Sequence, residues 1–437
     1  MYSYVDDFCY LEWLSRFTGA TVYGCLDTRT YPPGSAIVWW PAGLISTVFF
    51  GATIKVDFLR IAPIFVAFLS FFYWIGSLFL LIRFIDRNFS KILKTQLKII
   101  GWSVLFLFCV PILYYGTHRT TLLHTPELFF ILLMFDAMQL KRLWLVCACA
   151  AMAALLRMND FPALLFPLYL LLNQRHGVFS KLWMRIGTVT ILALPLLYIL
   201  WTAFGDGYHH KLNAWHLLQQ FSFIRVLHVF IGADWGLIWT APAWLMAWGA
   251  GLWRWRSLSA IARLCIVWMT ISLFICICWK GNGSDFGYRY LIGSYPGALW
   301  IFMEILLQMA PTLQRRWMQI CASVLTINAV WLFWLTWIYK EFPDVTPYGI
   351  RHWGGRHPEL LINSVRHLFD SQSYIQPLYH SPVAALYFTA SDHASRYAVP
   401  RGFWGLPSFP LLVATILASL ALLGSVLYLI HRFRRTP

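Results

Sequence analysis

Long apolar runs separated by short basic segments constrain the fold of this chain more than any other feature. A helix needs roughly 20 largely apolar residues to cross a bilayer, and seven runs qualify: 61–82, 184–204, 232–252, 264–280, 290–309, 317–338 and 408–430. Four shorter runs are also strongly apolar: 99–114, 127–140, 143–156 and 161–172. Only 12% of the 437 residues are charged, against about 25% in soluble proteins. The pattern predicts an all-α polytopic membrane protein with about eleven transmembrane helices.

Basic residues between these runs predict how the helices are oriented. Six short segments hold 18 of the 34 Lys and Arg residues, with Asp86 as their single acid. All six lie on one side if the eleven spans are real, and the positive-inside rule makes that side cytoplasmic, together with the C-terminal tail. The residues are Arg83, Arg87, Lys91, Lys94, Lys98, Lys141, Arg142, Arg175, Lys181, Arg185, Arg254, Arg256, Arg263, Arg315, Arg316, Arg432, Arg434 and Arg435. The net charge of +16 then reflects membrane orientation, and no nucleic-acid partner is expected.

This orientation divides the chain into four parts. Residues 1–60 form an outer-face loop with interfacial helices, because segment 36–54 contains Pro41 and would, as a span, place every later basic segment on the wrong side. The other parts are a transmembrane core, an outer-face soluble region rich in Pro, Gly, His and Tyr, and a last transmembrane helix with a basic cytoplasmic tail: 61–338, 339–407 and 408–437.

Two outer clusters near the start of the chain are candidates for chemistry. Asp6 and Asp7 are adjacent acids among aromatic residues in an acid-poor chain. An outer carboxylate can act as general base on an acceptor hydroxyl or amine, although a solvated terminal loop would have the same composition. Tyr31 opens a Tyr-Pro-Pro-Gly segment, which sets a rigid turn; a turn into an interfacial helix also explains it.

A third cluster, at 279–290, lies between two predicted spans and reads Trp-Lys-Gly-Asn-Gly-Ser-Asp-Phe-Gly-Tyr-Arg-Tyr. Its glycines let the backbone approach a ligand closely, and Lys280 and Arg289 can hold phosphate oxygens. The Gly-Lys-Ser/Thr ending of a Walker loop is absent. A flexible loop with cations that reach the interface is the alternative interpretation.

Two lesser candidates lie before and after the shorter apolar runs. His118 and Arg119 lead toward Glu127 at a predicted helix start, where an acid is also favoured by the helix dipole alone. Arg157, near the end of a predicted span, could reach the interface or bind a lipid phosphate. The histidines show no metal-binding spacing, and no metal or other cofactor is expected.

The order of these pieces resembles the GT-C superfamily of polytopic glycosyltransferases, which take sugars from polyprenyl-phosphate donors. The resemblance rests on the acidic pair followed by an aromatic residue and Leu, on Tyr-Pro-Pro-Gly before an apolar run, and on Gly-x-x-Phe-Gly-x-Arg-Tyr-Leu between later spans. It covers the layout of about residues 1–310. The bacterial branch of protein mannosyltransferases and aminoarabinose transferases is the most similar.

The resemblance implies a GT-C-like bundle with outer loops and a small C-terminal outer domain. It also implies transfer from a polyprenyl-phosphate sugar donor to a glycan, lipid or protein acceptor in the bilayer of a bacterial inner membrane. The implied catalytic residues are Asp6 and Asp7. Donor phosphate would be held by Arg289, Lys280 and Arg119, and substrate by Tyr31, His118, Glu127, Asp285 and Tyr288.

The chain departs from the family pattern at its start. Family members begin with a membrane-spanning helix just before the acidic motif, whereas Met1 here lies almost on that motif. We therefore expect an upstream helix to be missing from this sequence.

Two other functions remain open from the sequence. A transporter or lipid-linked sugar flippase places ionisable residues within its spans, and Asp136, Asp234 and Glu304 are the candidates. A polymerase or ligase of O-antigen type would use arginines of the 339–407 region, which contains Arg351, Arg356, Arg366, Arg396 and Arg401.

Overall fold

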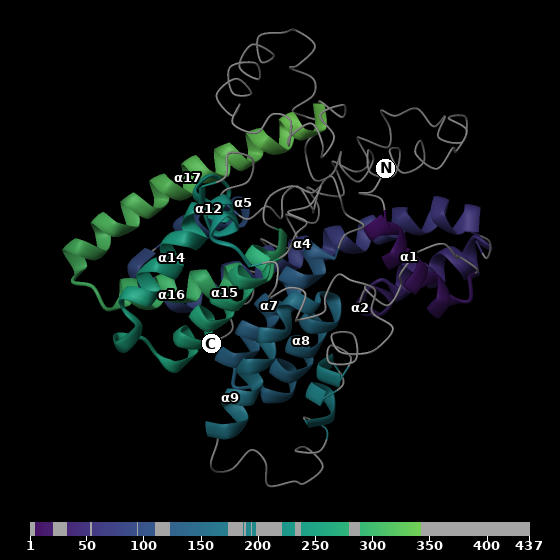
Figure 1. Ribbon diagram of the computed structural model, residues 1–437, viewed down its shortest axis with the longest axis horizontal. Helices are drawn as coiled ribbons and strands as arrows, with labels where there is room; N and C mark the ends of the chain where they lie inside the picture. Colours follow the sequence, from purple (N-terminus) through teal and green to yellow (C-terminus); the bar gives the residue numbers. More distant parts are fainter. Residues whose placement is uncertain are drawn as a thin grey trace.

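The computed structural model is helical wherever it describes the chain. It describes residues 5–20, 33–52, 55–93, 95–109, 123–173, 221–231, 237–278 and 289–341, with a few residues between 187 and 197. No β-strand occurs among them, which agrees with the all-α prediction. The α-helices (Figure 1) are α1 (Val5–Thr18), α2 (Gly34–Val38), α3 (Trp40–Leu44), α4 (Lys55–Leu93), α5 (Gln96–Phe108), α7 (His124–Gln139), α8 (Leu143–Leu156), α9 (Leu165–Asn173), α12 (Phe223–Ile231), α13 (Leu237–Thr240), α14 (Pro242–Trp253), α15 (Ala260–Cys278), α16 (Tyr295–Leu307) and α17 (Pro311–Glu341). One π-helix, η3 (Ile45–Phe49), and three 3-10 helices, η4 (Met158–Leu164), η5 (Trp255–Ser257) and η6 (Arg289–Ser294), complete the described elements.

Three helices are long and apolar enough to cross a membrane: Phe65–Asn88, Ala260–Cys278 and Tyr290–Leu307. They correspond to the predicted spans 61–82, 264–280 and 290–309. Shorter apolar helices lie at Lys98–Leu107, Leu143–Leu156 and Asn159–Leu172 and overlap three further predicted spans, 99–114, 143–156 and 161–172. The predicted span 408–430 lies outside the described residues, and the count of eleven stays a prediction.

Side-chain contacts fix the directions of the central helices. Helices α4 and α7 run in the same general direction. Tyr73, in the middle of α4, packs on Phe129 near the start of α7 (5.3 Å between ring centroids), and Arg87 near the end of α4 donates to Asp136 near the end of α7 (2.6 Å). Helix α16 runs in the same direction as α7. Gly293, just before α16, lies at Glu127 in the first turn of α7, and Trp300 of α16 lies 5.4 Å from Phe135 further along α7.

Helix α15 runs against this group. The Ser259 backbone N–H and hydroxyl, just before α15, bond the Glu304 carboxylate near the end of α16. Helix α14 runs with α16, because Trp244 near its start bonds Ser294 just before α16 and Gly251 near its end lies against Ile301. Arg87 near the end of α4, Arg142 after α7 and Arg254 after α14 therefore lie at one end of the bundle. The side of a membrane that this end faces stays a prediction.

The connection between α7 and α8 is a tight turn. Lys141 adopts a left-handed conformation (φ 55°), and the Arg142 N–H donates to the Ala137 carbonyl at 2.9 Å. Helix α8, rich in Ala and Cys, then packs closely against α7, as small residues allow. It ends at Leu156, and Arg157 is extended (φ −146°, ψ 121°) before η4. Helical geometry resumes in η4, which contains Pro162.

One predicted span is divided within the described residues. The run 232–252 was expected as one helix, but α13 ends at Thr240 and α14 begins at Pro242. Between them Ala241 leaves helical geometry (φ −145°, ψ 46°), because the residue before a proline is disfavoured in the α region.

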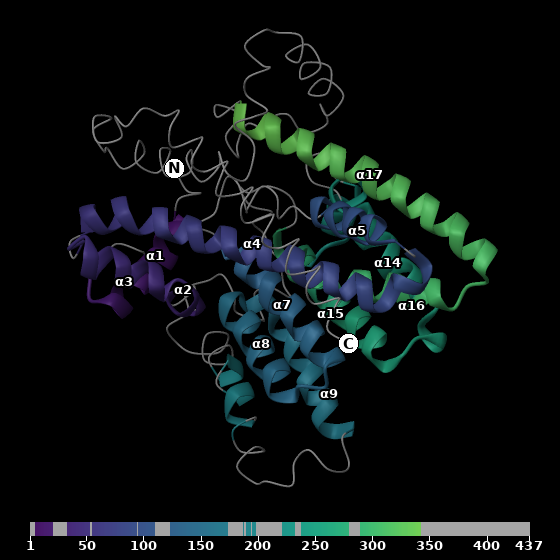
Figure 2. The same cartoon turned by 180° about the vertical axis from the view of Figure 1, so that it is seen from behind.

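The N-terminal helices form a unit that docks beside α8. Trp39, fully buried, meets the ring of Tyr10 edge-on at 6.3 Å, and the Ser35 hydroxyl donates to the Tyr10 carbonyl at 3.3 Å. Gly34 lies so close to the Leu155 carbonyl that any side chain there would collide with it. Segment 36–54, predicted to be interfacial, is broken into α2, α3 and η3. Seen from behind, α4 joins this unit to the helices around α5, α14 and α16 (Figure 2).

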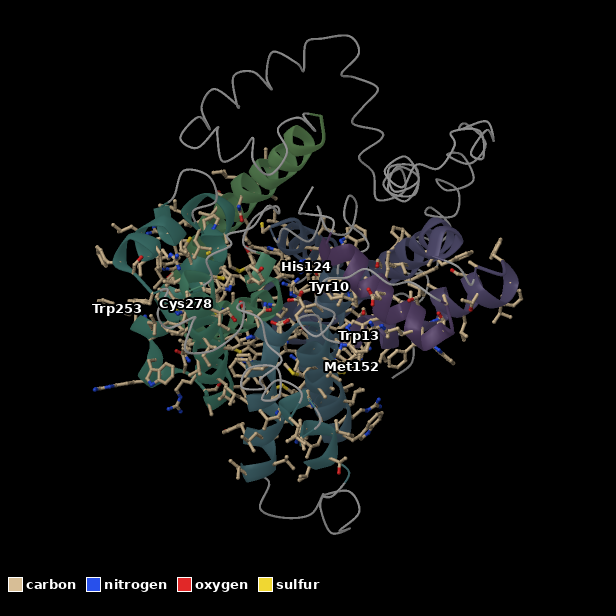
Figure 3. All side chains as sticks on the ribbon, turned by 45° about the vertical axis from the view of Figure 1, so that its right-hand side comes forward. Tyr10, Trp13, His124, Met152, Trp253 and Cys278 are labelled. Carbon is tan, nitrogen blue, oxygen red and sulfur yellow. The ribbon has the colours of Figure 1, made fainter. Side chains whose placement is uncertain are left out.

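The interior is filled by aromatic and aliphatic side chains rather than by a soluble-type polar mixture. Phe84, Phe135, Phe166 and Trp268 form a continuous series of ring contacts across α4, α7, α9 and α15. Figure 3 shows His124 within the body of the bundle and Trp253 at its edge. A polar side chain among such apolar neighbours needs hydrogen-bond or ion-pair partners. The buried side chains around His124 have such partners.

Candidate functional site

A buried polar cluster begins at the first turn of α7. His124, Thr125 and Glu127 are all fully buried there, and Pro126 occupies a first-turn position, where its missing N–H costs nothing. Glu127 therefore lies near the positive end of the helix dipole, as its place in the sequence predicted.

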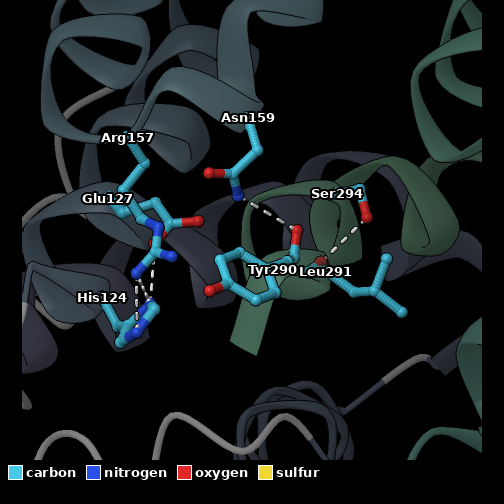
Figure 4. Close-up of polar contacts among 7 residues, drawn as sticks. All are labelled: His124, Glu127, Arg157, Asn159, Tyr290, Leu291 and Ser294. Carbon is cyan, nitrogen blue, oxygen red and sulfur yellow. Dashed lines mark hydrogen bonds and ion pairs between the residues drawn. The ribbon is translucent and has the colours of Figure 1, made fainter. Parts of the chain in front are cut away.

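Arg157, which directly follows α8, contacts His124 and Glu127 (Figure 4). The His124 Nδ1 atom lies 2.9 Å from Glu127 Oε2, and an Arg157 guanidinium N–H lies 2.8 Å from His124 Nε2. The same guanidinium nitrogen lies 3.1 Å from His124 Nδ1, so it approaches both ring nitrogens. Arg157 Nε lies 3.6 Å from the same carboxylate oxygen of Glu127.

The cluster then reaches η6, which immediately precedes α16. The Arg157 guanidinium lies 5.3 Å from the centroid of the Tyr290 ring, in cation–π geometry. The Asn159 side-chain amide donates to the Tyr290 carbonyl at 3.4 Å. Two residues flanking the break after α8 thus hold the start of η6 (Figure 4).

Asp160 packs against the middle of η6. It is fully buried, and a Cβ added at Gly293 would collide with its carboxylate. Glycine is therefore required at position 293 for this approach. The Asp160 and Glu127 carboxyl groups lie within hydrogen-bonding reach of each other, and the Gly293 backbone N–H approaches Glu127.

The charges of the cluster do not balance by themselves. Among the described residues, Arg157 contributes one positive charge and Glu127 and Asp160 two negative charges, and His124 adds a charge only when it is protonated. A buried site of this kind is costly unless it is neutral and hydrogen-bonded. These four side chains therefore need one further proton to be neutral, either on His124 or shared by the two neighbouring carboxyl groups.

The sequence-predicted site residues divide into three groups. Glu127 is the one that the structure describes completely. Asp6 and Asp7 lie in the first turn of α1, and Arg289 is the first residue of η6; their backbone alone is described. The remaining candidates lie outside the described residues: Lys280, Arg119, Tyr31, His118, Asp285 and Tyr288.

Backbone contacts bring three of these segments to the same end of the bundle. Arg289 directly precedes Tyr290, which contacts Arg157. Helix α1, with Asp6 and Asp7 in its first turn, is bonded to α2, and α2 packs on the end of α8 next to Arg157. The first turn of α7, with Glu127, completes the group.

Sequence reasoning missed part of this cluster and misjudged another part. His124 was not singled out, and Asn159 and Asp160 were read only as an interruption of an apolar stretch. Arg157 does not reach the interface as expected, since it is 6% exposed and bonded inward. The signal that was available is that ionisable residues inside apolar runs mark functional positions by default.

Two of the three acids considered for a transporter have structural partners. Asp136 bonds Arg87 at 2.6 Å and Arg83 at 3.3 Å, and Glu304 binds the N-terminus of α15. Asp234 lies outside the described residues. Within the described part of the chain, no group of three or more His, Cys, Asp or Glu side chains has a geometry that could hold a metal ion.

Fold and site together define a helical protein with membrane-spanning character and a buried ionisable cluster at the end opposite its basic segments. Comparisons with protein-family models, with characterised proteins and with solved structures find no match to this chain. The particular function is therefore proposed from the geometry and from the sequence pattern.

Proposed function

We propose that the protein is a membrane glycosyltransferase that moves a sugar from a polyprenyl-phosphate donor to an acceptor on the periplasmic or lumenal face. One observation carries the proposal. The segments with the acidic pair, with Glu127 and with Arg289 meet at one end of the bundle, away from the basic segments. A bacterial inner membrane with a cytoplasmic C-terminus is the location that fits this arrangement.

In this mechanism a carboxylate of Asp6 or Asp7 takes the proton from the acceptor hydroxyl or amine. The acceptor atom attacks the anomeric carbon, and the bond from that carbon to the phosphate oxygen breaks with inversion. The electron pair leaves with the lipid phosphate, whose charge Arg289, with Lys280 and Arg119, stabilises. The acceptor is a glycan, a lipid or a protein.

The buried cluster supports this chemistry by fixing η6. Arg157 and Asn159 hold Tyr290, and Asp160 packs on Gly293. Because Arg289 directly precedes Tyr290, these contacts restrict where its backbone lies. A phosphate-binding arginine held in this way pays less entropy on binding its ligand.

Transfer of radiolabelled sugar from polyprenyl-phosphate donors tests the proposal. The wild type in nanodiscs is compared with Asp6→Asn, Asp7→Asn and Arg289→Ala, each checked for an unchanged elution profile. Loss of one general base typically lowers the rate 10²–10⁴-fold. One of the two acid variants should therefore transfer sugar at least 10²-fold more slowly than the wild type. Full transfer by both acid variants and by the double variant would refute the assignment, and a chelator should leave the wild-type rate unchanged.

A proton-coupled transporter or flippase is the second candidate, and the buried Glu127–Asp160 pair favours it. Paired intramembrane carboxylates suit a proton relay. Movement of lipid-linked sugar across the bilayer without sugar release, abolished by Glu127→Gln, would support this function instead.

A further inference from the structure

An apolar cavity of about 340 Å³ lies away from the polar cluster, between α5, α14, α16 and α17. Its walls are almost entirely aliphatic and aromatic, with Trp102 and Phe106 from α5, Ala298 and Phe302 from α16, and Leu325 from α17. Such a lining offers hydrocarbon contacts and very few hydrogen-bonding groups. It therefore selects an apolar ligand or part of one.

The cavity is elongated along α16. Its lining extends from Tyr295 to Met309, which is about 21 Å along the chain at 1.5 Å per residue. One leaflet of the roughly 30 Å hydrocarbon core is about 15 Å deep. A single lipid chain running along the helices therefore fits the long axis of the cavity.

The two ends of the cavity differ in exposure. At one end Trp244 is fully buried and donates a hydrogen bond to the Ser294 hydroxyl at 2.9 Å, beside the buried Tyr295. At the other end the lining residues Trp253 and Leu313 are 88% and 45% exposed, and Figure 3 shows Trp253 at the edge of the molecule. A chain can therefore enter at the basic end.

A positively charged side chain lies at this entrance. Arg254, an exposed residue that directly follows α14, is the one charged residue among the described residues that line the cavity. Exposed tryptophans beside it, Trp253 and Trp255, suit the level of lipid headgroups. Apolar walls with a guanidinium at the mouth match an anionic phosphate attached to a hydrocarbon chain.

We infer that this cavity binds one acyl chain of an anionic phospholipid from the leaflet at the basic end, with its phosphate on Arg254. The polyprenyl donor of the proposed reaction does not fit this site, because its phosphate belongs near Arg289 at the opposite end. The lipid site thus goes beyond the proposed function and does not depend on it. The bound chain would hold α17 against α5 and α14.

Photocrosslinking tests the site. Phosphatidylglycerol with a diazirine in one acyl chain is incorporated into nanodiscs with the full-length protein, and labelled peptides are mapped by mass spectrometry. We expect labels on α16 and α17 residues of the cavity. Arg254→Gln should reduce them about fivefold, the contribution of one basic residue near an anionic surface. Arg256→Gln is the matched control, because Arg256 is also exposed but does not line the cavity, and it should leave the labels unchanged.

A second variant removes space rather than charge. Ala298→Phe, at a position 4% exposed in the cavity wall, should suppress the labels while labelling elsewhere on the protein persists. Equal labelling in Arg254→Gln and Arg256→Gln, or labels that ignore Ala298→Phe in a folded sample, would overturn the inference. So would displacement of the probe by polyprenyl phosphate at lower concentration than by unlabelled phosphatidylglycerol.

Discussion

At the scale of single residues, the buried cluster is held together by charge and by one glycine. Among the described residues, Arg157 is its one fixed positive charge, and it contacts a histidine, a carboxylate and an aromatic ring at once. Gly293 supplies no functional group, yet its lack of a side chain permits the contact with Asp160. Removing charge and adding bulk therefore test two different aspects of the same site.

Arg157→Met should destabilise the protein by about 3–5 kcal/mol, because it leaves two buried carboxylates without their cation. Adding Glu127→Gln should recover part of that loss, since one uncompensated charge is removed with it. Thermal unfolding in a fixed detergent measures both. An unchanged midpoint in Arg157→Met would show that the cluster is not buried as described.

Gly293→Ala should displace η6 and reduce transfer at least tenfold, because its methyl group occupies the space of the Asp160 carboxylate. Gly249→Ala is the control, at a helical position where an added methyl meets nothing within 4 Å. The rate of sugar transfer is measured for both. Normal transfer by Gly293→Ala would remove η6 from the mechanism.

At the scale of elements, local sequence features predict helix ends better than they predict which helices meet. The run 143–156 was predicted with the bounds that α8 has, because basic residues precede it and polar residues follow it. Pro242 split the run 232–252, as a proline inside an apolar stretch does when its preceding residue leaves the α region. The Asp160–Gly293 contact joins segments far apart in the chain, and no local pattern contains that information.

The N-terminus of α15 gives an element-scale prediction. Glu304 accepts from the Ser259 hydroxyl at 2.6 Å and from its backbone N–H, where free N–H groups need acceptors. Glu304→Ala should cost about 1 kcal/mol, as loss of a helix cap does. Glu304→Gln keeps an acceptor and should cost less. A thermal midpoint that falls equally in both variants would contradict this capping role.

At the scale of the whole molecule, the apolar runs predicted the helical class, and three helices are long and apolar enough to cross a membrane. The orientation predicted from the basic segments stays a prediction. The candidate site was predicted only in part. Glu127 was found because it starts an apolar run, whereas His124 and Asp160 became visible only when three helices were placed together. Burial turns an ordinary histidine or aspartate into a constrained group, and burial is a property of packing.

We propose that sugar transfer occurs at the end of the bundle opposite the basic segments. The most direct measurement is transfer to an acceptor supplied on one side only of sealed proteoliposomes that contain the donor and protein of known orientation. We expect product only when the acceptor faces the end with Glu127 and η6, and none when it faces the end with Arg87 and Arg254. Product from the basic end, or no product from either side with a folded protein and several donors, would contradict the account.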